Sequence, residues 1–220
     1  MAIWDDIIPE EEREAYRKAG WGGTIGFGKR PAIVVVDMNK AFVDQNYPFS
    51  SPAAIPAVEK IKDILIIARQ KKVPIVYTTL AKIHNKAELG YWKADALIDP
   101  IVNEGDGRDI YPMIAPQEGE TVIEKYYPSG FFGTNLSSLL NYYKTDTVIV
   151  TGTVTCGCVR ATVLDAFNHN YRVIVPQECV CDRGEVSHKV ALFEFHMKYA
   201  DVVDTQLVHD YLEKIVYNPL

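Results

Sequence analysis

Four runs of β-branched residues, separated by segments with helical spacing, constrain the fold of this chain more than any other feature. The runs are AIVVVDM (32–38), VPIVYTTL (73–80), DTVIVTGT (146–153) and YRVIVP (171–176). Because their apolar residues are continuous rather than alternating, they are typical of strands buried on both faces. Segments with helix-like patterns lie between and after these runs, at 51–72, 133–144, 158–170 and 187–200. Strands that alternate with helices predict a parallel sheet with helices on both faces.

Weaker signals complete a three-layer α/β/α architecture, Rossmann-like in outline, with about six parallel strands. ETVIEK (120–125) predicts a further strand, DVVDT (201–205) a short sixth one, and TQLVHDYLEKIV (205–216) a last helix. The segment 81–119 contains glycine and proline and is expected to be irregular, with a short helix near Trp92. A connection of that length inside a compact domain usually covers or shapes a site.

The beginning of the chain has a different character from the rest. Residues 1–20 form an amphipathic pattern typical of a helical arm, and the glycine-rich link GWGGTIGFGKRP follows, without a phosphate-loop motif. We therefore expect an N-terminal arm and linker over residues 1–30 and a single domain over residues 31–220. A chain of 220 residues is long enough for one domain with a sizeable core.

The charge and composition of the chain argue against several classes of partner. The net charge is −6, and no run of Lys or Arg marks a nucleic-acid footprint. No apolar run approaches the length of a membrane span. The acidic N-terminus lacks the basic and then apolar pattern of a signal peptide. We therefore expect a cytoplasmic protein that binds neither nucleic acid nor membrane, and whose four cysteines are free thiols.

Three side chains with acid, amine and thiol chemistry fall at the ends of predicted strands. Asp37 ends the first strand, Lys125 ends the strand at 120–125, and Cys158 begins the helix that follows the strand at 146–153. In open α/β sheets, ligands bind outside the carboxyl ends of the strands. The pattern therefore brings a carboxylate, an amine and a thiol to one edge of the sheet.

These three groups are the components of nucleophilic catalysis by a thiol. A helix N-terminus and a nearby cation lower the pKa of a thiol, so we expect a lowered pKa for Cys158 beside Lys125. Asp37 is placed to take the thiol proton and to deliver it later to a leaving amine. Small residues before Cys158 let backbone N–H groups converge on a developing oxyanion. Each residue alone has a structural explanation, and only their coincidence favours a site.

The cysteines and one histidine leave other kinds of site open. Both cysteine pairs, Cys156 with Cys158 and Cys179 with Cys181, have C-x-C spacing, whereas zinc sites favour C-x₂₋₄-C and redox sites favour C-x-x-C. Four thiolates on two loops can nevertheless converge on one zinc ion. His84 follows the second strand, where it is able to line the site, to hold a metal with a partner, or to form a Cys–His dyad.

Three motifs resemble the isochorismatase-like cysteine hydrolase superfamily, and the resemblance covers residues 26–204. They are PAIVVVDMNKAF with Asp37, EKYYPSGFFGTNL with Lys125, and VTGTVTCGCVRATVLDAF with Cys158, in the order of the superfamily. The resemblance implies a Cys–Asp–Lys catalytic triad made of these three residues. Cys156 occupies a position that is often filled by a small residue in that superfamily.

The resemblance also implies an oxyanion hole and a substrate pocket. A cis peptide bond between Thr153 and Val154 is expected to turn the Val154 N–H toward the N–H of Cys158. Arg183 follows the fifth strand and matches an arginine that holds a substrate carboxylate, for which its planar fork is suited. The other candidate substrate-binding residues are Phe42, Trp92, Phe131 and Thr155.

Within the superfamily, the segments IGFGKRPA, YPSGFFGT and ECVCDR are most similar to N-carbamoylsarcosine and maleamate amidohydrolases. The resemblance implies an enzyme that cleaves a C–N bond of a small linear ureido or amide acid and releases ammonia through a covalent thioester or thiocarbamate. Maleamate, biuret, ureidoacrylate and isochorismatase-type hydrolysis are alternatives, and a binding or scaffold protein is the non-enzymatic one. TTLAKIHNKAELGYW lacks the metal-binding Asp and His cluster of the nicotinamidase branch, so no metal or other cofactor is expected. Family precedent implies a homo-oligomer, a tetramer or dimer.

Overall fold

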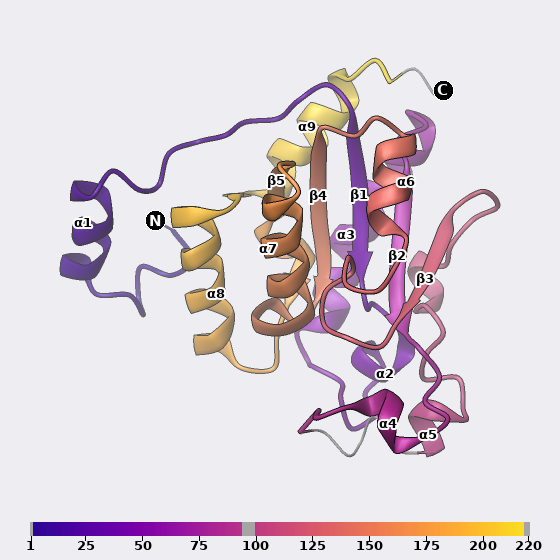
Figure 1. Ribbon diagram of the computed structural model, residues 1–220. Helices are drawn as coiled ribbons and strands as arrows, with labels where there is room; N and C mark the ends of the chain where they lie inside the picture. Colours follow the sequence, from indigo (N-terminus) through magenta and orange to yellow (C-terminus); the bar gives the residue numbers. More distant parts are fainter. Residues whose placement is uncertain (1, 94–99, 218–220) are drawn as a thin grey trace.

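A parallel β-sheet forms the centre of the computed structural model, which describes residues 2–93 and 100–217 (Figure 1). The strands are β1 (Pro31–Val36), β2 (Ile75–Leu80), β3 (Thr121–Lys125), β4 (Thr147–Thr153), β5 (Arg172–Pro176), β6 (Val180–Cys181) and β7 (Asp201–Val203). Their order is β3-β2-β1-β4-β5-β7, β6 pairs with β4 beyond the end of β5, and every pairing is parallel. The predicted α/β fold is confirmed, and the two-residue strand β6 is an element that the sequence pattern missed.

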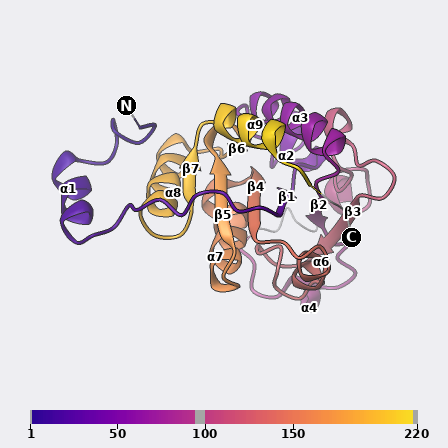
Figure 2. The ribbon, with the colours of Figure 1, turned by 90° about the horizontal axis from the view of Figure 1, so that it is seen from above.

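Helices cover the sheet on both faces, which gives the three layers visible from above (Figure 2). On one face lie α3 (Ala54–Gln70) and α9 (Thr205–Lys214). On the other face lie α6 (Leu136–Tyr142), α7 (Arg160–Asn168) and α8 (Glu185–Lys198). These helices match the predicted segments to within a few residues at each end, except that a π-helical turn, η3 (Thr155–Val159), precedes α7.

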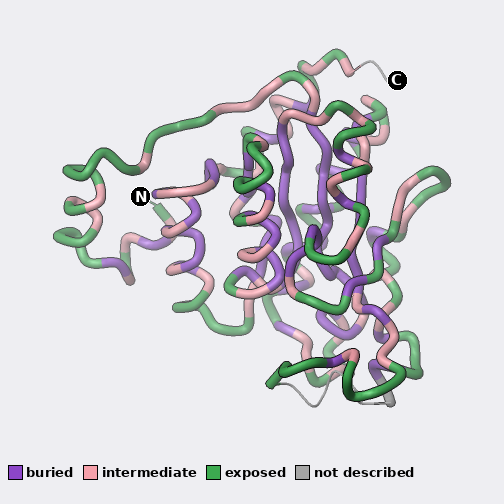
Figure 3. Tube along the Cα trace, in the orientation of Figure 1, coloured by how far each residue is buried: buried purple, intermediate pink, exposed green. Residues whose placement is uncertain are grey.

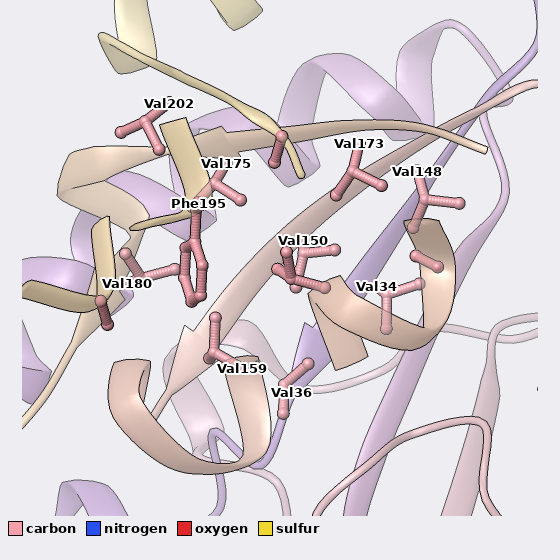
Figure 4. Close-up of a cluster of buried hydrophobic side chains, with 14 of the residues drawn as sticks. Val34, Val36, Val148, Val150, Val159, Val173, Val175, Val180, Phe195 and Val202 are labelled. Atoms are coloured by element: carbon pink, nitrogen blue, oxygen red, sulfur yellow. The ribbon is translucent and has the colours of Figure 1, made fainter. Parts of the chain in front are cut away.

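The alternation of side chains along β1 explains why its run of apolar residues is continuous. Ile33 and Val35 face the core under α3 and α9, whereas Val34 and Val36 face the core under α6, α7 and α8. All six residues of β1 are buried, so both faces of the strand need apolar side chains. Figure 4 shows Val34, Val36 and valines of neighbouring strands in the second core, and Figure 3 shows the buried central strands.

The long connection between β2 and β3 lies at the end of the sheet to which the strand arrows point (Figure 1). In its described part it holds α4 (Lys86–Leu89), α5 (Pro100–Asn103) and the 3₁₀ turn η2 (Pro112–Ile114). The short helix expected near Trp92 is α4, which ends before that residue. The short helix α2 (Lys40–Val43), which was not predicted, lies at the same end, capped by the side chain of Asn39.

The N-terminal segment lies on the side of the molecule that holds α8 and β7 (Figure 2). The ring of Tyr16, on α1 (Glu10–Lys18), contacts the ring of Phe193 on α8 edge-on at 5.2 Å between centroids. Further along, the N–H groups of Ile25 and Gly26 donate to the carboxylate of Asp201. The ion pair of Asp6 with Lys189 and the bond from the N–H of Gly22 to the carbonyl of Met197 attach the segment at further points. No helix in the described ranges combines the length and apolar character that crossing a membrane requires.

Gly152 is a position in β4 where the neighbouring strand β1 leaves no room for a side chain. Its φ is +114°, and a Cβ built there lies 2.0 Å from the carbonyl oxygen of Val36, directly before Asp37. We expect Gly152→Ala to lower the free energy of unfolding by more than about 3 kcal/mol, because backbone strain and overlap with β1 add together. Urea unfolding followed by circular dichroism measures this loss.

Gly119→Ala is the matched control, since Gly119 has φ +88° but open space around the position of a Cβ. It carries the strain of the left-handed backbone without the overlap, and we expect a loss of only about 1–2 kcal/mol. Equal losses in the two variants would contradict the close approach of β1 and β4.

Candidate active site

The site lies at the point where the strand order of the sheet reverses. β1 and β4 are neighbours in space, and the connections that leave their carboxyl ends turn to opposite sides of the sheet. A crevice opens at such a switch point because no helix crosses it. Asp37 follows β1, and the loop that carries Cys158 follows β4. The expected meeting of strand ends is therefore observed.

Asp37 and Lys125 form a buried ion pair at the floor of the site. Lys125 Nζ lies 2.7 Å from Asp37 Oδ2, with side-chain exposures of 1% and 0%. Lys125 Nζ also donates to the carbonyl of Tyr127 at 3.1 Å. Burial by itself lowers the pKa of Lys125, whereas the neighbouring Asp37 and Cys158 raise it. The net effect is a pKa above the usual value, so the amine stays protonated.

The other oxygen of Asp37 is held by a residue that the sequence reasoning missed. Thr78 Oγ1, on β2, donates to Asp37 Oδ1 at 2.8 Å, and the backbone N–H of Asp37 donates to the carbonyl of Thr78 at 3.1 Å. These bonds support a φ of +50° at Asp37, a conformation that few non-glycine residues adopt. Thr78 lies two residues before the end of β2, so the strand-end rule that selected Asp37 and Lys125 does not reach it.

Cys158 contacts this ion pair, but its acidity differs from the expectation. Burial, followed by the charge of Asp37, raises the pKa of the Cys158 thiol to about 12, and the opposing effect of Lys125 is smaller. The predicted lowering of the pKa is therefore wrong, because the nearby cation is already paired and the thiol is buried. The resting thiol is neutral and lies against a carboxylate that is able to accept its proton.

The loop before Cys158 has an unusual backbone. The Thr153–Val154 peptide bond is cis, as the resemblance implied. Cys158 lies inside the π-helical turn and not at the first residue of α7. Turns of this kind are frequent at functional sites. The roles of the Val154 and Cys158 N–H groups in an oxyanion hole stay predictions.

A cavity of about 190 Å³ opens in front of Cys158 and Lys125. This is below the roughly 300–1,000 Å³ of pockets that bind drug-sized ligands, so it fits a small molecule. Its walls are mostly apolar and aromatic, and two arginines reach it, Arg108 and Arg183. The other residues around it are Phe42, Phe49, Leu80, Ala81, Ile83, Leu89, Trp92, Val102, Asn103, Tyr126, Tyr127, Val154 and Gly157.

The structure brings three of the five predicted substrate-binding residues to this cavity. Arg183 and Phe42 form part of its wall, and so does Trp92, whose Nε1 donates to the carbonyl of Tyr126 at 3.1 Å. Phe49 and Arg108 were missed. Phe49 lies in a loop without a strand-end signal, and Arg108 lies in the irregular connection between β2 and β3, where no pattern fixes the position of a side chain.

Phe131 and Thr155 do not line the cavity. Phe131 belongs to the core under α6 and α7, where its ring stacks on His169 at 5.0 Å. In the segment YPSGFF the ring of Phe131 is buried, whereas that of Phe132 is exposed. Thr155 is fully buried, and its hydroxyl bonds instead to Nδ1 of His188 on α8, at 2.8 Å.

The alternative metal and dyad arrangements find no support in the geometry. Across residues 2–93 and 100–217, no group of three or more His, Cys, Asp or Glu side chains is placed to hold a metal ion. His84 is exposed and lies outside the wall of the cavity, so it is not placed as the base of Cys158. Cys179 and Cys181 are buried free thiols, and burial raises the pKa of both.

Comparison with known proteins agrees with the fold and the motifs. The isochorismatase domain model matches residues 31–206. Maleamate amidohydrolase of Pseudomonas putida is 37% identical over 84% of this chain and 88% of its own length, and N-carbamoylsarcosine amidase of Arthrobacter is 35% identical over 94% and 82%. The solved structure of N-carbamoylsarcosine amidase from Thermoplasma acidophilum superposes with a TM-score of 0.69 at 30% identity, over 80% of this chain and 96% of that one.

The shared fold and the sequence identity to these relatives show that the protein is an enzyme of the hydrolase class. More specifically, the chain belongs to the isochorismatase family.

Thr78→Val tests the positioning of the carboxylate. Valine keeps the shape of threonine but removes the hydrogen bond to Asp37 Oδ1. A hydrogen bond to a charged group contributes about 1.5–3 kcal/mol, so we expect kcat/KM to fall by about ten- to a hundredfold. Steady-state kinetics on the best amide substrate measures this loss.

Thr151→Val is the matched control, because Thr151 is also a fully buried strand threonine, and its hydroxyl faces the carbonyl of Val34 at 3.4 Å. We expect this variant to keep kcat/KM within about threefold. If Thr78→Val also kept its activity, Thr78 would have no part in orienting Asp37.

Proposed function

We propose that the protein is a cysteine-dependent amidohydrolase that cleaves a C–N bond of a small linear amide or ureido acid and releases ammonia. The observation that carries the proposal is the contact of the Cys158 thiol with the buried Asp37–Lys125 pair at the end of a small cavity. The 35–37% identity to a maleamate amidohydrolase and an N-carbamoylsarcosine amidase supports the class of bond.

The first half of the reaction forms a covalent intermediate. Asp37 accepts the proton of the Cys158 thiol while Sγ attacks the carbonyl carbon, and the π electron pair moves to the oxygen. The N–H groups of Val154 and Cys158 stabilise that oxyanion, with each such donor contributing about 3–4 kcal/mol. When the oxyanion collapses, the C–N bond breaks and Asp37 returns its proton to the departing ammonia.

The second half of the reaction regenerates the thiol. Asp37 takes a proton from water, the hydroxide attacks the thioester or thiocarbamate, and the proton passes to the departing Cys158 Sγ. An amide acid gives a dicarboxylate. A ureido acid gives a carbamate that decomposes to carbon dioxide and an amine. Lys125 keeps its proton throughout and stabilises the negative charge as it moves between Asp37 and Cys158.

The substrate is expected to carry a carboxylate at the end away from the amide. The guanidinium of Arg183 reaches a cavity with otherwise mostly apolar walls, and its fork matches a carboxylate. Substrates with this pattern include N-carbamoyl amino acids, maleamate and ureidoacrylate. Biuret lacks the carboxylate, so Arg183 favours it less. Isochorismate presents a vinyl ether in place of an amide, so the identity to an amidohydrolase and an amidase favours it less.

We also propose that the protein is a cytoplasmic homo-oligomer, a dimer or tetramer. Trp21 and Ile25, in the linker after α1, are 52% and 40% exposed, although both are apolar. Neighbouring exposed apolar side chains are typical of surfaces that pack against another chain. The Ile25 backbone is at the same time anchored to Asp201, so the linker presents these side chains in a fixed conformation.

Cys158→Ser decides the identity of the nucleophile. We expect ammonia release from the best of N-carbamoylsarcosine, maleamate, ureidoacrylate and biuret to fall by at least about 10³-fold, because a serine hydroxyl is a far weaker acid than a thiol and Asp37 alone does not activate it. Cys156→Ser, which changes an exposed thiol, should stay within about tenfold of the wild type. Full activity of Cys158→Ser refutes the assignment, and ammonia from none of the amides favours a binding or scaffold role.

Arg183→Lys tests the carboxylate site. Lysine keeps the positive charge but loses the fork, so we expect KM for an acid substrate to rise by about ten- to a hundredfold with a smaller change in kcat. The corresponding methyl ester lacks the charge, and its KM should change little. An equal rise in KM for acid and ester would show that Arg183 does not bind the carboxylate.

A further inference from the structure

The segment that carries Arg183 runs beside the loop that carries the nucleophile. β6 pairs with the end of β4 in register, Gly152 beside Val180 and Thr153 beside Cys181. The next residue after each strand, Val154 and Asp182, lies where the ladder ends. Two segments about 30 residues apart in the sequence therefore enter the cavity from adjacent strands.

Asp182 connects the two segments beyond the end of the ladder. Its Oδ2 accepts the backbone N–H of Cys156 at 2.8 Å, and its Oδ1 accepts the N–H of Arg183 at 2.8 Å. Its own carbonyl accepts the hydroxyl of Ser51, which is buried, at 2.9 Å. One carboxylate thus joins the nucleophile loop to the residue that bears the cavity guanidinium.

The guanidinium of Arg183 is itself held in one orientation. Its Nε and Nη2 atoms both donate to the carbonyl of Phe49, at 3.0 and 2.7 Å. Its central carbon lies 5.6 Å from the ring centre of Phe42 and 5.8 Å from that of Phe49. Because the edge formed by Nε and Nη2 already binds this carbonyl, the edge that includes Nη1 remains for a carboxylate.

We propose that Asp182 is a positioning residue that fixes the distance between the Arg183 guanidinium and the Cys158 thiol, and thereby selects substrates by the number of atoms between their carboxylate and the scissile carbonyl. This inference rests on the proposed function, because it takes Arg183 as the carboxylate site and Cys158 as the nucleophile. A carboxylate held at one end leaves the carbonyl within reach of the thiol only at one chain length, and a misplacement of about 1 Å costs about a hundredfold in rate.

Asp182→Asn separates this role from a general effect on folding. Asparagine has the same shape, but its single carbonyl oxygen accepts only one of the two N–H groups, and its amide faces the other as a second donor. The matched control is Glu185→Gln, which removes the negative charge of an exposed side chain whose hydrogen-bond partner is Lys189 on α8. Thermal unfolding verifies that each variant is folded.

The first measurement uses a series of ω-amide acids, from malonamate through succinamate to glutaramate. The wild type should prefer one length in kcat/KM by at least about tenfold. In Asp182→Asn we expect this ratio to fall at least fivefold, whereas Glu185→Gln keeps the wild-type ratio. A structural role alone would slow all lengths by one factor. An unchanged ratio in Asp182→Asn overturns the inference and leaves the amidohydrolase proposal intact.

The second measurement needs no amide hydrolysis. Bromoacetate, 3-bromopropionate and 4-bromobutyrate alkylate thiols, and peptide mass spectrometry resolves Cys158 from Cys156. Each rate at Cys158 is divided by the rate of the same reagent with glutathione, which removes intrinsic reactivity. The wild type should favour one length, and Asp182→Asn should flatten the preference.

The two measurements distinguish the possible failures. If no amide acid releases ammonia, the proposed function fails, and the alkylation series still decides whether Asp182 sets the spacing. If the wild type alkylates at Cys158 with no preference for length, or if Asp182→Asn retains the preference, the inference is overturned. In Arg183→Met the length preference should be lost, and adding Asp182→Asn should then change nothing further.

Discussion

The rest of the site depends on the buried ion pair between Asp37 and Lys125. Desolvation of two charges costs several kcal/mol each, and replacing such a pair by apolar residues is often neutral or stabilising. The structure compensates with hydrogen bonds from Thr78 to Asp37 and from Lys125 to the carbonyl of Tyr127. The pair is therefore weak evidence for stability. Its value lies in a buried carboxylate that is held in one orientation beside the Cys158 thiol.

The sheet topology determines from which side each group approaches the Asp37–Lys125 pair. Lys125 comes from β3 and Asp37 from β1, so the lysine crosses the end of β2 and covers the carboxylate from one side. Cys158 lies on the opposite side, in the π-helical turn that follows β4. The crevice at the switch point leaves the space above the pair to a ligand, and the connection between β2 and β3 closes that space with apolar walls around Trp92 and Val102.

The sequence predicted the parts of the molecule that follow from periodicity and strand ends. Continuous valine and isoleucine runs are typical of strands that are buried on both faces, and the strand-end rule brought Asp37, Lys125 and Cys158 together. The raised pKa of Cys158 could not be predicted from the sequence, because a pKa depends on how far the group is buried and on whether the nearby cation, Lys125, is already paired. The placement of Phe131 at the cavity was wrong for a related reason. Two adjacent aromatic residues give no signal of which ring turns inward. Here Phe132 is the exposed one of the two.

The raised pKa of Cys158 has a consequence for the order of proton transfers. Expelling ammonia from a tetrahedral intermediate requires a proton on the nitrogen, and a thiol that stays neutral at rest keeps that proton in the site until the substrate arrives. A permanently ionised thiolate would attack faster but would have lost this proton to solvent. In the proposed reaction, one proton moves from Cys158 Sγ to Asp37 and on to the leaving nitrogen, and no exchange with bulk water is needed before the first product departs. A buried, neutral thiol is thus suited to amides, whose poor leaving group makes protonation the difficult step.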